Sequence, residues 1–111
     1  MQNISIELKS LIENFVHTEN DGNLKFEIEE DVYTTLTKIN ITDLVDFSIG
    51  IEESFKLKNE VFEKLKEDFF AVTYHCEKGW FENPKLLEMF NNKNQALAFA
   101  KEYIEKIGSE N

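Results

Sequence analysis

The chain has 111 residues, of which 41% are hydrophobic and 31% are charged, and its formal net charge is −10. This length fits a single domain over residues 1–111 with one modest core, and the composition excludes a disordered chain. All 12 basic residues are lysines, so the chain lacks the arginines that read phosphate and guanine, and we expect it to bind neither nucleic acid nor an anionic membrane surface. An AT-rich genome would equally explain the missing arginine.

The single cysteine, Cys76, has no partner for an internal disulfide, which is typical of a protein from a reducing compartment. The first ten residues lack the basic region and apolar stretch of a secretion signal. No apolar run approaches the roughly 20 residues that span a bilayer. We therefore expect a cytoplasmic protein.

The first half of the chain predicts a helix, a turn and a strand. Residues 4–17 predict an amphipathic helix capped by Asn3, because hydrophobic residues recur at the helical spacing. Residues 20–23 have the composition of a turn, and residues 24–29 alternate between hydrophobic and charged side chains, as a half-exposed strand does. Residues 30–42 fit either a helix or extended chain.

The segment from residue 45 to residue 57 also fits two structures. Its hydrophobic side chains fall on odd positions, namely Val45, Phe47, Ile49, Ile51, Phe55 and Leu57. This alternation is typical of a strand. A helix face is the alternative, with the spacing of Leu44, Phe47, Ile51 and Phe55. Gly50 would cost a helix interior about 1 kcal/mol relative to alanine, so we favour the strand.

The second half predicts further helices and strands. In chain order these are a helix over 60–67 capped by Asn59, a strand over 69–76, a strand at Trp80-Phe81, a strand over 85–90, and a helix over 94–107 that begins at Asn92 or Asn94 and ends at Gly108. Strands in a run, with helices at both ends of the chain, predict an α+β fold. In it, an antiparallel sheet carries the N-terminal and C-terminal helices on one face.

The sequence indicates no catalytic residue, metal ligand or cofactor. It contains no glycine-rich phosphate loop, nucleophile elbow or zinc-protease motif. His75 and Cys76 are neighbours on a predicted strand, so their side chains point to opposite faces and cannot share one metal ion. His17 lies near acids but has no second soft ligand. We therefore expect a non-catalytic protein.

The acidic residues are concentrated between residues 19 and 53, where ten acids and two lysines give a net charge of −8. A field localised in this way can steer a basic protein partner, although it can also serve solubility alone. The predicted partner-binding acids are Glu27, Glu29, Glu30, Asp31, Asp43, Asp46, Glu52 and Glu53. In a strand over 45–57, Asp46 and Glu52 would project from one face. Trp80 is a candidate interface anchor, or it closes the core instead.

Two families resemble this chain. Residues 39–65, which read INITDLVDFSIGIEESFKLKNEVFEKL, are similar to the second-helix region of acyl carrier proteins. That resemblance implies a helical docking domain, but residues 40–42 replace the motif that holds the carrier serine. In size and acidity the whole chain resembles bacterial immunity proteins, including those of contact-dependent inhibition systems. This second resemblance implies an inhibitor that covers the active site of a basic nuclease-type toxin, which is the function we favour.

Overall fold

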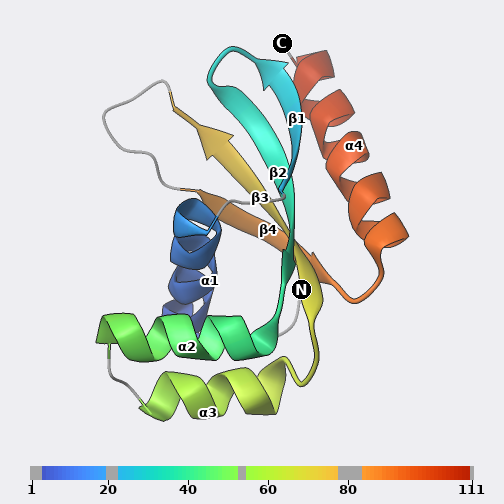
Figure 1. Cartoon of the computed structure of the whole chain (residues 1–111). Helices are drawn as coiled ribbons and strands as arrows, with labels where there is room; N and C mark the ends of the chain where they lie inside the picture. The colour runs from blue at the N-terminus through green and yellow to red at the C-terminus, as the bar shows by residue number, and fades with distance from the viewer. Residues whose placement is uncertain (1–3, 20–22, 53–54, 78–83, 111) are drawn as a thin grey trace.

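The computed structural model describes residues 4–19, 23–52, 55–77 and 84–110. Over these residues the chain forms four helices and four strands (Figure 1). In chain order they are α1 (Ile6–Thr18), β1 (Leu24–Glu29), β2 (Val32–Ile39), α2 (Ile41–Glu52), α3 (Phe55–Lys64), β3 (Phe69–Cys76), β4 (Lys85–Phe90) and α4 (Lys93–Glu110). Within this part of the chain, no helix has the length and apolar character needed to cross a membrane.

The four strands form one antiparallel sheet in the order β1-β2-β3-β4. The longest ladder joins β2 to β3, from Val32 opposite Cys76 to Ile39 opposite Phe69. Register shifts interrupt the two outer ladders, between Glu27 and Glu29 in β1 and between Val72 and Thr73 in β3. The long, regular ladder therefore lies at the centre of the sheet.

Helices cover both faces of the sheet, with α4 on one face and α1 on the other (Figure 1). Under α4, two alanines allow the helix to approach the strands closely; the buried residues of this cluster are Leu36, Val72, Ala96 and Ala100. The larger cluster joins α1, α2 and α3 to the opposite face, and its fully buried members include Leu8, Ile12, Ile39, Leu44, Val61 and Ala71.

The structure confirms the α+β class, the antiparallel sheet and the helices at both ends of the chain. It differs from the expected arrangement in that the helices do not share one face. The physical reason lies in the central strands, because neighbouring positions such as Ala71 and Val72 are both fully buried. A strand that buries both sets of side chains needs a cover on each side.

The predicted strand over residues 45–57 is wrong, because residues 45–52 belong to α2 and residues 55–57 begin α3. Helix α2 buries Leu44, Val45 and Ser48, which lie on one side of a helix. Ile49 and Gly50 are exposed, and a Cβ at Gly50 would meet nothing within 4 Å. The burial of the other side of α2 therefore stabilises the helix by more than Gly50 destabilises it.

Side-chain caps define the beginnings of three helices. Ser5 caps α1, accepting a hydrogen bond at 3.0 Å from the Leu8 N–H, whereas Asn3, the expected cap, lies outside the described residues. Asn40 accepts hydrogen bonds from the first turn of α2. Asn92 does the same for α4, which confirms the predicted start. Asn59 lies inside α3, so the cap predicted there is wrong.

The helix predicted over 60–67 overlaps α3 only at residues 60–64, because α3 begins at Phe55 and ends at Lys64. The other boundaries lie closer to those expected. The strands over 24–29, 69–76 and 85–90 are confirmed, and the ambiguous residues 30–42 contain β2. Helix α4 continues through Gly108 to Glu110, beyond its predicted end. The predicted strand at Trp80-Phe81 lies outside the described residues.

The packing of α1 predicts different effects for two identical substitutions in that helix. Ile12 is fully buried, whereas Ile6 is 80% exposed. Ile12→Ala should lower the free energy of unfolding by about 2–5 kcal/mol, because it leaves a cavity in the core. Ile6→Ala should change it by less than about 0.5 kcal/mol. Urea unfolding of both variants measures the difference, and similar losses in the two would contradict the assigned face of α1.

Candidate functional site

The predicted partner-binding acids form two separate groups in the structure. Glu27 lies on β1, and Glu29, Glu30 and Asp31 lie at the β1–β2 turn, where all four are exposed. Asp43 and Asp46 are exposed on α2, which lies at the opposite end of β2 (Figure 1). The eight residues of β2 separate the groups by about 25 Å, at a rise of roughly 3.3 Å per residue.

Three of the predicted partner-binding residues, Glu52, Glu53 and Trp80, belong to neither group. The backbone of Glu52 ends α2, so the expected projection of Asp46 and Glu52 from one strand face is wrong. Glu53 and Trp80 lie outside the described residues. Asp43 and Asp46, three positions apart on a helix, do share one side of α2.

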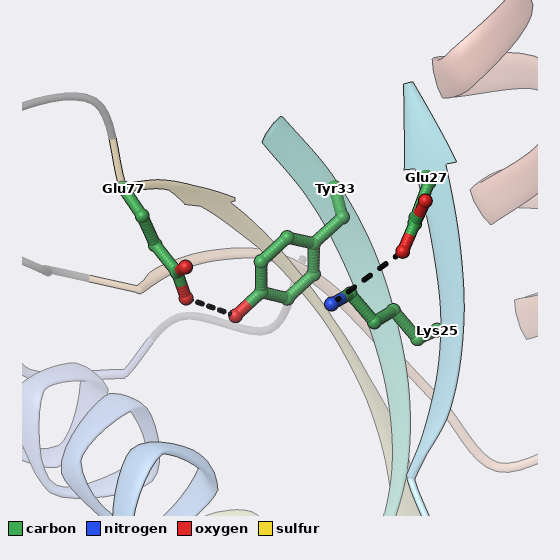
Figure 2. Close-up of polar contacts among 4 residues, drawn as sticks. All are labelled: Lys25, Glu27, Tyr33 and Glu77. Atoms are coloured by element: carbon green, nitrogen blue, oxygen red, sulfur yellow. Dashed lines mark hydrogen bonds and ion pairs between the residues drawn. The ribbon is translucent and has the colours of Figure 1, made fainter. Parts of the chain in front are cut away.

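The first group, which we call the hairpin group, consists of Glu27, Glu29, Glu30 and Asp31, and it lines one surface pocket together with Lys25 and Tyr33. Figure 2 shows Lys25 and Tyr33 between the carboxylates of Glu27 and Glu77. The Lys25 Nζ atom lies 3.7 Å from the Glu27 Oε1 atom and 4.1 Å from the centre of the Tyr33 ring. The Tyr33 hydroxyl donates a hydrogen bond of 2.5 Å to the Glu77 carboxylate. The charge of Lys25 therefore offsets part of the negative charge at this end of the sheet.

His75 lies beneath this group in a buried polar network. Its ring stacks on the Tyr33 ring, with centroids 4.6 Å apart and planes 7° from parallel. Its Nε2 atom lies 2.8 Å from the Thr73 hydroxyl and 3.1 Å from the Thr35 hydroxyl. The two hydroxyls are 2.5 Å apart. These contacts join β2 to β3 through their side chains as well as their backbones.

Burial lowers the pKa of His75 to about 4, because the cationic ring would lose its hydration. The nearby Glu77 carboxylate opposes this shift, while His17 and Lys25 add to it. The imidazole is therefore neutral at pH 7. A histidine bonded to a hydroxyl can activate a nucleophile, but Thr73 is fully buried and Thr35 is 5% exposed, so neither hydroxyl is open to a substrate. The network stabilises the sheet.

A groove of about 580 Å³ lies between α1, β2 and α2. We call it the α1–α2 groove, and it is lined by Phe15, Glu19, Thr37, Asp43, Asp46 and Phe47, together with Lys38. The rings of Phe15 and Phe47 meet edge to face, with centroids 5.4 Å apart. Glu19 is the C-terminal cap of α1, so the groove brings a carboxylate from the end of one helix to the two carboxylates of another.

The polar groups of the α1–α2 groove have few partners within the protein. No side-chain hydrogen bond or ion pair joins Glu19, Asp43 or Asp46 to another residue that the structure describes. Thr37 is only 3% exposed, and its hydroxyl oxygen is buried without a hydrogen-bond partner among those residues. The groove therefore combines solvated negative charge with one buried group that lacks a partner.

The sequence predicts two acids of the groove, Asp43 and Asp46, but not their neighbours. Thr37 and Glu19 were missed, because a threonine in an ambiguous segment carries no signal of burial and Glu19 precedes a turn. Of the two aromatic residues, Phe15 belongs to the core cluster and Phe47 packs against it. The helical spacing of Asp43 and Asp46 was the signal that could have placed them together.

Searches against protein-family models, curated proteins and solved structures found no match to this chain. Among the described residues, no three His, Cys, Asp or Glu side chains lie close enough together to hold a metal ion. The two acidic groups and the α1–α2 groove are therefore the features that indicate a function.

The pKa of His75 predicts how stability depends on pH. Between pH 6.5 and about 4 the unfolded chain binds a proton that the folded chain excludes, so stability should fall as the pH drops through this window. The loss from His75 should reach at most about 3 kcal/mol. Urea unfolding of the native protein and of His75→Gln, from pH 7.5 to 4, separates this loss from that of the carboxylates. If the free energy of unfolding depends on pH in the same way in both proteins, the contribution predicted for His75 is wrong.

Proposed function

We propose that this protein is a non-catalytic acidic binding protein for a basic protein partner. We further propose that it is an immunity protein, which inhibits a nuclease-type toxin by covering its basic active site. The observation that supports this proposal is the α1–α2 groove, where three exposed carboxylates have no partner among the described residues. Carboxylates left unpaired within a protein remain available to the charges of another molecule.

The two acidic groups also suit a single interface. Glu27 is paired with Tyr33 in the sheet, and Tyr33 lies two and four positions before Thr35 and Thr37 on β2. Alternate residues of a strand share a face, so Glu27 and the groove lie along the same face of the sheet. A partner that buries roughly 800 Å² would cover a patch about 30 Å across, which reaches both groups.

The alternative of a carrier-like docking domain gains no support from the architecture. A carrier domain is expected to be almost entirely helical, whereas the central element of this chain is a four-stranded antiparallel sheet. At the position of the missing carrier motif, Asn40 caps α2 with its side-chain oxygen. This segment therefore begins a helix and presents no attachment serine.

Nuclease inhibition tests the proposal directly. The purified protein is assayed against a panel of basic nuclease toxin domains, and an equimolar amount should abolish the activity of the matching domain. In a variant with Glu27→Lys, Glu30→Lys, Asp43→Asn and Asp46→Lys, association should slow by about tenfold or more and should depend less on salt. Asp43 is changed only to asparagine, because a lysine in the first turn of α2 would oppose the helix dipole.

The control variant changes the charge by +6, against +7 for the first variant, at acids that belong to neither acidic group. Glu63, Glu102 and Glu105 are exposed on α3 and α4, and their replacement by lysine should slow association much less. Equal losses in the two variants would show that the acids act only through net charge. Undiminished nuclease activity across the panel at micromolar protein would contradict the proposed function.

A further inference from the structure

The α1–α2 groove contains a buried hydroxyl that no described residue satisfies. Thr37 stands opposite Ala71 in the β2–β3 ladder, and Ala71 belongs to the core cluster of α1, so both side chains point to the face where the groove lies. A buried hydroxyl without a hydrogen bond is unfavourable, and such groups are rare in folded proteins. A donor supplied by a ligand would remove this cost.

The charged side chains around the groove indicate the charge of that ligand. Three carboxylates, those of Glu19, Asp43 and Asp46, surround the groove against a single lysine, Lys38. Lys38 alternates with Thr37 along β2, so its side chain begins on the opposite face of the sheet. The field inside the groove is therefore negative, which favours a cation that also donates hydrogen bonds.

The aromatic pair narrows the choice of cation. Phe47 is half-buried and meets Phe15 edge to face on the groove wall. A planar guanidinium group stacks on such a ring and carries five N–H donors in a fixed plane. An ammonium group has three donors around a point charge and is more strongly hydrated.

We infer that the α1–α2 groove holds the side chain of an arginine from the basic partner. In this arrangement the guanidinium group stacks on Phe47, donates to the Thr37 hydroxyl and pairs with the carboxylates of Asp43 and Asp46. The groove, at about 580 Å³, is large enough for one such side chain and the backbone that carries it. This inference rests on the proposed function, because it names the group by which the basic partner is recognised.

A titration with small probes tests the groove without any partner. The probe is N-acetyl-arginine methylamide, added to ¹⁵N-labelled protein at constant ionic strength and followed by amide chemical shifts. Saturable shifts are expected at residues that line the groove, namely Phe15, Thr37, Asp43, Asp46 and Phe47, with a dissociation constant on the order of millimolar. The neutral citrulline analogue should leave these shifts unchanged, and the lysine analogue should bind several-fold more weakly.

Two threonine variants separate binding from stability. Thr34 is also fully buried with an unpaired hydroxyl, but it faces α4, since its partner in the sheet, Tyr74, packs against Tyr103. Thr37→Val and Thr34→Val make the same chemical change, and neither should lower the melting temperature. Thr37→Val should weaken binding of the arginine probe by about tenfold, because a hydrogen bond to a charged group is lost. Thr34→Val should bind as the native protein does.

Three results would overturn the inference. One is an equal effect of the two valine variants, the second is equal binding of the lysine or citrulline analogue, and the third is a set of shifts centred on the hairpin near Glu27 and Glu30. Failure of the inference is distinguishable from failure of the proposed function. A protein that inhibits a nuclease but ignores the arginine probe retains the function and loses only the groove as its recognition site.

Discussion

Strand β2 lies between two neighbours and beneath helices on both faces, so most of its side chains are shielded from water. Its backbone N–H and C=O groups form hydrogen bonds in the ladders to β1 and β3. The polar groups of β2 that still need partners are therefore those of its side chains. Three of them, Thr34, Thr35 and Thr37, are buried threonines. Helix α4 packs on one face of this strand, whereas α1 and the groove lie along the other. The register of β2 therefore determines which of its own side chains face the groove.

The buried threonines divide according to what stands opposite them in β3. Thr35 faces Thr73, and the two hydroxyls meet the His75 ring, so that three polar groups satisfy one another. Thr37 faces Ala71, which offers no polar atom. Two threonines on the same face of β2 therefore differ in effect. Thr35 stabilises the sheet, whereas Thr37 has an unpaired hydroxyl. The difference arises from the partner strand alone.

The sequence predicted the elements whose local signals agree with their packing. Strand β3 was predicted because its composition and its burial coincide, and α4 because its hydrophobic face and its cap at Asn92 coincide. Helix α2 was missed because an apolar alternation by chance overlaid a helical face, and only the contact with α1 and α3 decides between them. The acids of the site could be identified from the sequence. Their division into two groups could not, because it depends on the length of β2, which separates them. Thr37 could not be predicted, since its missing partner is a property of the register with β3.

Two local features of the α1–α2 groove oppose the stability of the fold. Glu19 follows the last turn of α1, where the helix dipole is negative, and a carboxylate there is unfavourable by about 0.3–1 kcal/mol. The Thr37 hydroxyl is buried without a described partner, and valine would fill the same space without that cost. By contrast, Asp43 stabilises α2, because it lies in the first turn of that helix. Solubility would be served by an acid at any exposed position and gives no reason for a buried hydroxyl. Unfavourable groups from α1 and β2 converge on one groove beside the two acids of α2, and such local conflicts are expected where a protein binds another molecule.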